Sequence, residues 1–353
     1  MIMTEEVLFT KEGQLGLILL NRPGALNALT LSMILAMQRQ LSLWKHDDSI
    51  HAVVIQAAPG SAFCAGGDVR SLYYSGRLND SEQMQFFWHE YRLNQFIHNF
   101  GKPYISLIDG MVMGGGVGIS MHGSHPVASD HFVFAMPETS IGFFPDIGAS
   151  YLLTRCPGSL GVYLGLTGNR LGAHDALKAK LVKAVVASDQ ITSLLNALKK
   201  KDLSENAMAE VDKCLREYSL APSESDPSQI KPAINVCFAH SSIEMIKASL
   251  QDIPGVWPVS VDNALSQKSP LSLKITLEQL RKAKGLSLEQ CLQMDYDMVS
   301  HFMHGSDFYE GVRALLIDKD KKPKWHPDRL DLVTEHMVAD YFVRSHAALE
   351  WVE

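Results

Sequence analysis

Short apolar runs alternate with longer amphipathic segments over the first half of the chain. Five of the runs predict β-strands, at residues 7–10, 15–21, 52–57, 104–108 and 131–135. The first two are joined by polar residues 11–14, which predicts a β-hairpin. The run at 52–57 is apolar almost throughout, as expected of a strand whose two faces are both buried.

The segments between these runs predict helices. Thr30 is a favoured N-cap residue, and apolar side chains follow it at three- and four-residue steps as far as Trp44. Further helices are predicted at residues 81–100, 117–123, 149–153 and 160–166. Strands that alternate with helices indicate an α/β fold, and the glycine-rich turns follow strands, where such folds place their functional sites.

The chain becomes mainly helical from about residue 190. Amphipathic periodicity predicts helices at residues 242–251, 271–284 and 287–304. Residues 219–233 are polar and proline-containing, which predicts a loop. We therefore expect a core formed by residues 1–200 and a mainly helical C-terminal region, residues 201–353, that packs on it.

Composition describes an ordinary soluble protein of 353 residues, 46% apolar and 20% charged. Its formal charge of −7 argues against a nucleic-acid partner, because such proteins carry a basic surface. No run approaches the ~18 apolar residues of a membrane-spanning helix, so no membrane partner is expected. The five cysteines form no CxxC pair, and the N-terminus resembles neither a signal nor a transit peptide. These features together predict a cytoplasmic protein.

Two carboxylates, Glu138 and Asp146, interrupt an otherwise apolar and glycine-containing stretch. Asp146 has a simple structural explanation as a helix N-cap, and Glu138 has one as part of an exposed turn. If both acids are buried instead, at least one carboxyl pKa is raised, which leaves a general base that titrates near neutrality.

Two groups of glycines, Gly66–Gly67 and Gly114–Gly116, flank predicted elements. Backbone amides at the start of a helix point outward and favour negative charge. The amides of the triplet and of Gly67 could therefore form an oxyanion hole for a thioester or amide carbonyl. Close packing of helix on strand also selects glycine, so spacing alone leaves both interpretations open.

Other polar residues have simple structural interpretations. Glu90 lies on the aromatic helix and is by itself expected to be solvated. The histidines show no metal-binding or catalytic spacing, so no metal site is predicted. Lysines 319, 321, 322 and 324 form a basic cluster that is either a solvated face or a contact for phosphate. Arg22 could add to such a contact or cap a turn.

Four ordered motifs carry a resemblance to a known family. They are LNRPGALNAL (20–29), SAFCAGGDV (61–69), GMVMGGGVGIS (110–120) and MPETSIGFFPDIG (136–148). Together they resemble the crotonase (enoyl-CoA hydratase/isomerase) superfamily over roughly the first 185 residues. The C-terminal segment EGVRALLIDKDKKPKW (310–325) is similar to the 3-hydroxyisobutyryl-CoA hydrolase subfamily, which extends the resemblance over nearly the whole chain.

The resemblance implies a crotonase-like spiral of ββα units with a helical C-terminal region. It implies an acyl-CoA substrate whose thioester carbonyl lies between the amides of Gly67 and Gly115. It also implies that CoA is part of the substrate and product, with no separate cofactor. We expect the CoA moiety to be bound by residues Arg22, Ala25, Lys319, Lys321 and Lys322.

One departure discriminates within the superfamily. Hydratases carry a glutamate just after the glycine triplet, where this chain has Gly118, whereas their second glutamate matches Glu138. Asp146 stands where hydratases usually have glycine, and Glu90 matches a substrate-contacting residue of the hydrolases. The resemblance thus implies hydrolysis of 3-hydroxyisobutyryl-CoA in valine breakdown, with Glu138 as nucleophile or general base.

The alternatives are an enoyl-CoA hydratase or isomerase and a non-catalytic acyl-CoA-binding protein, because a fold alone does not fix an activity. A homo-oligomer is possible, since superfamily relatives often form trimers or hexamers.

Overall fold

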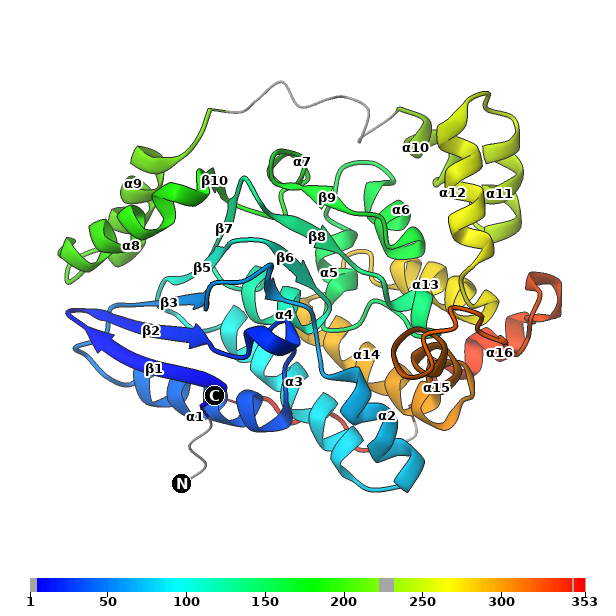
Figure 1. The fold of residues 1–353 in the computed structure, drawn as a ribbon, viewed down its shortest axis with the longest axis horizontal. Coiled ribbons are helices and arrows are strands. Elements are labelled where there is room, and N and C mark those ends of the chain that lie inside the picture. The colour runs from blue at the N-terminus through cyan, green and yellow to red at the C-terminus, as the bar shows by residue number, and fades with distance from the viewer. Residues whose placement is uncertain (1–4, 222–231, 345, 353) are drawn as a thin grey trace.

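The computed structural model describes residues 5–221, 232–344 and 346–352, whose chain path is shown in Figure 1. A six-stranded sheet has the order β1 (Val7–Glu12), β2 (Leu15–Leu20), β3 (Ala52–Ala57), β5 (Tyr104–Ile108), β7 (His125–Ser129), β10 (Ala184–Val186). A four-stranded sheet has the order β4 (Ala62–Cys64), β6 (Met111–Met113), β8 (Val133–Ala135), β9 (Leu171–Gly172). The β1–β2 and β8–β9 pairs are antiparallel and the others are parallel.

The chain passes between the two sheets in a repeating order. β3 is followed by β4, β5 by β6, and β7 by β8, and helices follow each pair. These helices of the first half are α1 (Leu31–Lys45), α2 (Val69–Leu78), α3 (Glu82–His98), α4 (Gly115–Met121), α5 (Ala149–Leu153), α6 (Leu160–Thr167) and α7 (Ala173–Lys178). Three 3-10 helices accompany them, η1 (Pro23–Ala25), η2 (Glu138–Ile141) and η3 (Ser188–Gln190). This succession of ββα units forms the spiral expected from the sequence.

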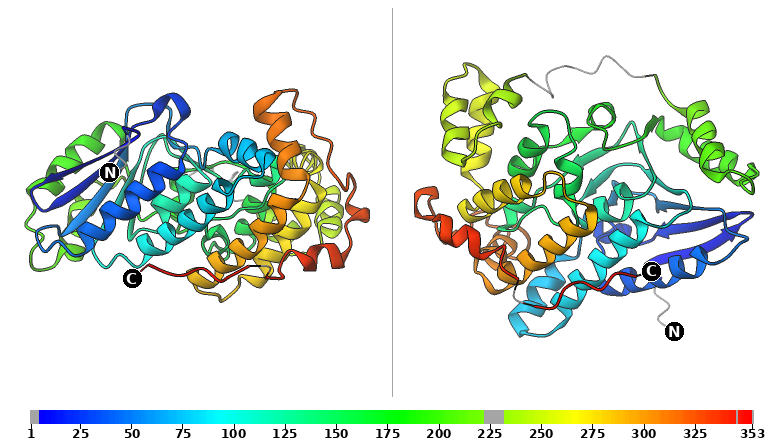
Figure 2. Two further views of the ribbon diagram at one scale, coloured as in Figure 1. Left: turned by 90° about the horizontal axis from the view of Figure 1, so that it is seen from below. Right: turned by 180° about the vertical axis from the view of Figure 1, so that it is seen from behind.

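Helices dominate the second half. They are α8 (Ile191–Lys200), α9 (Ala207–Tyr218), α10 (Pro232–Cys237), α11 (Ile243–Gln251), α12 (Val256–Ser266), α13 (Pro270–Lys282), α14 (Leu288–His304), α15 (Asp307–Val312) and α16 (Glu335–Asp340), with the π-helix η4 (Arg313–Ile317) and the 3-10 helix η5 (Leu330–Leu332). α8 and α9 bury their apolar faces on the larger sheet, whereas α13 to α16 gather at the opposite end of the molecule (Figure 1). Residues 346–352 run back along α3 and α14 (Figure 2), where Arg92 Nε donates to Glu350 O at 2.5 Å.

Most of the predicted elements are confirmed. Thr30 caps α1 by accepting from Met33 N at 3.3 Å. The helix after the glycine triplet begins within it, at Gly115, rather than after it. Part of the predicted loop at 219–233 lies outside the described residues, and α10 already begins at Pro232.

The apolar core continues across residue 200, where the boundary between the two predicted regions lies. One cluster of buried side chains joins Phe143 and Phe144 of the first half to Leu288, Phe302 and Phe308 of the second. The division into residues 1–200 and 201–353 stays a prediction. Among the described residues, none of the helices has both the length and the apolar character needed to cross a membrane.

Candidate active site

A cavity of about 350 Å³ lies where the glycine turns of the first half meet the C-terminal helices. Its walls are residues 65–67 and 113–115, six residues of η2 and the turns beside it (Pro137, Glu138, Ser140, Ile141, Phe143, Asp146), Val69 and Leu72 of α2, three residues of α3 (Phe86, Phe87, Glu90), and Phe308, Leu315 and Leu316. The C-terminal region thus completes the cavity whose other walls carry the sequence motifs.

Three carboxylates from separate elements reach this cavity. Glu90 of α3 is 2% exposed, and Glu138 of η2 and Asp146 of the following turn are each 6% exposed. Glu90 is therefore not the solvated helix residue that its position alone suggests, and Glu138 is not in an exposed turn. The N-cap of α5 is Gly148, so the capping explanation for Asp146 is wrong as well.

Burial raises the pKa of all three carboxyl groups, and the negative charge of Asp146 adds to the effect on the other two. Burial raises the pKa of Glu90 well above its usual value, and the charges of Asp146 and Glu138 add to the effect. Burial and the Asp146 charge likewise raise the pKa of Glu138. Burial raises the pKa of Asp146 to about 7. The Tyr91 hydroxyl, which donates to Asp146 Oδ2 at 2.7 Å, acts in the opposite direction and lowers that pKa. Among the described residues, Glu90 Oε1 and Glu138 Oε2 have no hydrogen-bond partner.

Gly67 and Gly115 approach one another at the wall of the cavity. A Cβ atom on Gly115 would lie 3.3 Å from Gly67 N. Two backbone hydrogen bonds of 2.8 Å hold this turn. Leu29 N donates to Gly66 O, and Asp68 N donates to Leu29 O. Within the described chain, the Gly67 N–H therefore has no backbone acceptor, and Gly115, as the first residue of α4, has none inside its helix. Two free amides this close can receive one oxyanion.

Packing also requires glycine at both positions. A Cβ on Gly115 would meet Glu90 Oε1 at 2.2 Å, and one on Gly67 would meet Phe86 Cζ at 2.9 Å. The two interpretations left open by the sequence, close packing and a ligand site, are therefore compatible. The same contact shows that the Glu90 carboxylate lies directly over the Gly115 backbone.

Gly118 faces α3 rather than open space. A Cβ at this position would lie 2.7 Å from Asn94 Oδ1 and 2.8 Å from Asn94 Nδ2. Asn94 is one helical turn beyond Glu90 on α3. A glutamate at position 118 would therefore displace Asn94, and in this chain α3, not α4, supplies a carboxylate to the cavity.

The turn that carries Asp146 is held by residues from distant parts of the chain. Ile147 has φ of +57°, an unfavourable value for a β-branched residue. His122 Nε2 lies 2.7 Å from the Ile147 carbonyl. From the C-terminal helices, Asp295 Oδ2 accepts from Gly148 N at 2.7 Å, and Gln279 Nε2 donates to Pro145 O at 2.9 Å.

Gln279 and Asp295 also bind each other, with Gln279 Nε2 2.8 Å from Asp295 Oδ1, and both are fully buried. No sequence motif pointed to these two residues or to Tyr91. Asp295 did leave a signal, because it stands at an apolar-stripe position of α14, between Leu292 and Val299. Tyr91 left none that separates it from the other aromatic residues of α3.

The residues expected to bind CoA do not line the cavity. Arg22 is engaged by Glu6 and Asp68, each at 2.9 Å, and Ala25 is half-buried in η1. Residues Lys319, Lys321 and Lys322 belong to the loop that follows η4, and two leucines of η4 line the cavity. Arg313 organises this loop by pairing with Glu310, Asp318 and Asp320.

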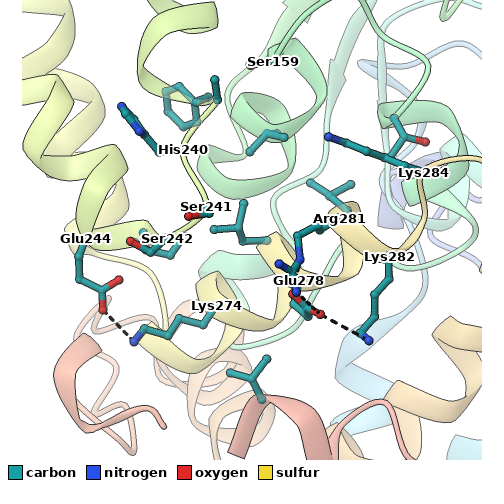
Figure 3. A pocket seen from close by; sticks show the side chains of 18 of the residues that line it. Ser159, His240, Ser241, Ser242, Glu244, Lys274, Glu278, Arg281, Lys282 and Lys284 are labelled. Atoms are coloured by element: carbon teal, nitrogen blue, oxygen red, sulfur yellow. Dashed lines mark hydrogen bonds and ion pairs between the residues drawn. The ribbon is translucent and has the colours of Figure 1, made fainter. Parts of the chain in front are cut away.

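A second cavity, of about 680 Å³, lies between α6, α11, α13 and α16 (Figure 3). Of its three acidic residues, Glu335 is exposed, and Glu244 and Glu278 are paired with basic side chains. Glu244 binds Lys274 at 2.8 Å, and Glu278 binds both Arg281 at 2.9 Å and Lys282 at 3.4 Å. Among the described residues, no group of three or more histidines, cysteines or acids is arranged to hold a metal ion in either place.

Comparison with known proteins adds independent information. Residues 15–342 match the family model described as enoyl-CoA hydratase/isomerase. The chain is 44% identical to "3-hydroxyisobutyryl-CoA hydrolase, mitochondrial" of Xenopus tropicalis, covering 96% of this chain and 88% of that protein. It is 41% identical to the Homo sapiens protein of the same name, with the same coverage.

Solved structures are similar over almost the full length. A carnitinyl-CoA dehydratase from Mycobacterium thermoresistibile superposes with a TM-score of 0.91 at 36% identity and covers 99% of both chains. An enoyl-CoA hydratase from Rhodobacter sphaeroides 2.4.1 superposes with a TM-score of 0.90 at 34% identity, over 98% of this chain and all of that one.

These relatives correct one prediction and establish the family. The predicted cytoplasmic location is wrong, because the curated hydrolases that match this chain are named as mitochondrial proteins. That prediction depended on cysteine spacing and the character of the first residues, neither of which determines the compartment. The fold, the ordered motifs and the match over residues 15–342 agree, and the chain belongs to the enoyl-CoA hydratase/isomerase family.

Proposed function

We propose that this chain is a thioester hydrolase that cleaves 3-hydroxyisobutyryl-CoA to 3-hydroxyisobutyrate and CoA. The observation that carries the proposal is the set of Glu90, Glu138 and Asp146, buried in one cavity beside two free backbone amides. The curated relatives at 41–44% identity are named for this reaction, which supports it independently.

The amides of Gly67 and Gly115 bind the thioester oxygen in this proposal. Negative charge grows on that oxygen as the carbonyl carbon becomes tetrahedral, and fixed N–H donors stabilise it without having to reorganise. Gly115 also stands at the start of α4, so the positive end of the helix dipole adds to the effect.

Glu138 brings about the attack on the thioester carbonyl carbon, by one of two routes. As a nucleophile, its carboxylate bonds to the carbonyl carbon, the C–S bond breaks, and the thiolate leaves and takes up a proton. Water then cleaves the resulting anhydride. As a general base, Glu138 instead takes a proton from the water that attacks the carbonyl. Both routes require the ionised carboxylate, so the raised pKa of Glu138 makes the rate increase with pH.

Asp146 and Glu90 are proposed to accept a hydrogen bond from the 3-hydroxyl group of the acyl chain. A buried carboxylate that loses such a partner is left unpaired, so a site of this kind discriminates strongly against acyl groups without the hydroxyl. The apolar walls, which include Phe86, Phe87 and Phe143, favour a short, compact acyl group.

The CoA moiety is proposed to lie along the loop after η4, with Lys319, Lys321 and Lys322 near its phosphates. Arg22 is a weaker candidate because two carboxylates already engage it. Thioester hydrolysis by amides and carboxylates needs no metal or further cofactor, and chelator treatment should leave the rate unchanged. A homo-oligomer stays a prediction.

The second candidate function is hydration of an enoyl-CoA. Two solved structures with TM-scores of 0.91 and 0.90, described as a dehydratase and a hydratase, favour it. Gly118 argues against it, because hydratases hold their water between two glutamates and Asn94 blocks the position of one of them.

The test is thiol release from 3-hydroxyisobutyryl-CoA, compared with isobutyryl-CoA and crotonyl-CoA. We expect rapid thiol release from the first, with the second cleaved far more slowly. Consumption of crotonyl-CoA without free thiol would favour the hydratase. Thermal protection by CoA without turnover of any thioester would indicate a binding protein.

A further inference from the structure

Lys268 brings a positive charge to the catalytic cavity from the second half of the chain. It lies between α12 and α13 and is half-buried. Its Nζ donates to Ser140 Oγ at 2.5 Å. Ser140 lines the cavity and belongs to η2, the same short helix that begins with Glu138. The ammonium group is thus attached two residues from the proposed catalytic carboxylate.

The backbone around Lys268 is fixed on η2. Ser269 N donates to Thr139 O at 3.3 Å, and Ser269 Oγ donates to Asp307 Oδ2 at 2.6 Å. Ser269 also caps α13 by accepting from Ser272 N at 3.0 Å. The lysine side chain is therefore held at both ends, by the backbone contacts of the next residue, Ser269, and by the hydrogen bond from its Nζ to Ser140.

The charges that face Glu138 are otherwise negative. Asp146 of the next turn acts on Glu138, and Glu90 of α3 shares the cavity with both. Asp307 of α15, which packs on η2, is directed to Ser269 and to the His326 N–H. Negative charges buried in one cavity disfavour one another's ionised form, so a neighbouring cation favours the ionised form of the carboxylate on which it acts.

We propose that Lys268 is the counter-charge of this cavity, a positioning residue whose ammonium group, held by Ser140, favours the ionised form of Glu138 beside Asp146 and Glu90. The inference depends on the proposed catalytic role of Glu138. Burial lowers the pKa of Lys268 to about 8, and the negative charge of Glu138 opposes this by raising it. Lys268 also lowers the pKa of Glu138, against the larger raising effects of burial and Asp146.

The first test is the pH dependence of kcat/KM for thiol release. Lys268→Met should move the acid-side midpoint of the kcat/KM profile to a pH that is higher by about one unit or more. The resulting loss of kcat/KM is about tenfold on the acid side and is recovered at high pH. Lys268→Arg keeps the positive charge and should leave that midpoint unchanged. Lys274→Met removes a lysine of the second cavity and should also retain it.

An equal loss at every pH, or an unchanged limb, in Lys268→Met would overturn the proposal. So would a limb that moves as far in Lys268→Arg as in Lys268→Met, because the charge would then not be the cause. Circular dichroism melting of each variant separates these effects from a loss of folding.

A second measurement does not depend on the substrate. Infrared titration follows the protonated carboxyl band, and Glu138→Gln identifies which part belongs to Glu138. Its midpoint should be higher in Lys268→Met than in the unmodified protein, and an equal midpoint rejects the role of Lys268. If the protein releases no thiol, the proposed function fails, whereas this titration still decides the role of Lys268.

Discussion

The cavity around Glu138 and the cavity between α11 and α13 differ in size and in the way their acids are satisfied. The second is larger, about 680 Å³ against 350 Å³, and its walls carry more charged residues. Yet Glu244 and Glu278 are paired with basic side chains and partly exposed. Around Glu138, three carboxylates are buried, and Glu90 and Glu138 each have an oxygen without a partner in the part of the chain that the structure describes.

The difference teaches that unpaired buried charge identifies a functional site better than size does. Burying a carboxylate without a partner is costly, and folds avoid it where it has no use. Paired and solvated charges such as Glu244–Lys274 contribute little to stability, and each already has its partner. Variants in one cavity can therefore be compared with variants in the other.

Among changes outside the three carboxylates, Gly115→Ala should have the largest effect. Its Cβ would lie 2.2 Å from Glu90 Oε1 and would displace either that carboxylate or the amide that binds the oxyanion. Thiol release should fall by about 100- to 1000-fold. The control is Gly172→Ala, whose Cβ would meet nothing within 4 Å. An unchanged rate in Gly115→Ala would contradict the oxyanion-hole assignment.

Asp295→Ala should have the next largest effect. It leaves the Gly148 N–H and one of the two Gln279 amide hydrogens without an acceptor in a fully buried place, which costs about 1–3 kcal/mol of stability. The displaced Asp146 turn should also lower kcat by roughly ten- to a hundredfold. Asp295→Asn retains an acceptor and should recover part of both. Loss of stability without loss of kcat would show that the clamp does not position Asp146.

The two cavities should respond oppositely to pH. The folded-state pKa of Asp146 is about 7, against about 3.9 in an unfolded chain, so the folded state holds an extra proton between these values. The free energy of unfolding therefore falls as pH rises from 4 to 7, by up to about 4 kcal/mol from this group. Asp146→Asn should flatten that part of the profile measured by denaturant unfolding.

Glu244 should change the free energy of unfolding with pH in the opposite direction. Burial alone would raise its pKa, but the Lys274 ammonium and neighbouring donors outweigh burial and lower it. Its contribution is present above the unfolded pKa and is lost as pH falls through the folded value. If Asp146→Asn leaves the slope between pH 4 and 7 unchanged, Asp146 does not carry the raised pKa on which this prediction depends.

The smallest expected effect lies in the second cavity. A double-mutant cycle of Lys274→Met and Glu244→Gln should give a coupling energy of about 0–1 kcal/mol, because the pair is partly exposed. Thiol release should be unchanged in all three variants. A coupling of several kcal/mol, or a loss of activity, would show that this cavity is more than a solvated surface.

The sequence predicted which residues meet in the smaller cavity better than it predicted the strands around them. Glu138, Asp146, Gly67 and Gly115 were singled out because they stand in ordered motifs, and Glu90 through the same resemblance, and all five line that cavity. Their catalytic roles stay predictions. Strands such as β4 and β6 were missed, because three residues are too short to show periodicity.

The supporting residues were out of reach for a different reason. Gln279 and Asp295 lie more than 130 positions from the turn they hold, and Lys268 lies 128 positions from Ser140. No local pattern encodes contacts of that separation. Asp295 could be suspected as an acid on an apolar stripe, but its partner could be found only from the folded chain.

The most direct test of the account compares two single carboxylate changes in one assay. Initial rates of thiol release from 3-hydroxyisobutyryl-CoA are measured for the unmodified protein, Glu138→Gln in the smaller cavity, and Glu244→Gln in the larger one. We expect Glu138→Gln to lose about 10²- to 10⁴-fold while Glu244→Gln keeps the full rate. Equal rates in the two variants would contradict the claim that the buried, unpaired carboxylates carry the reaction.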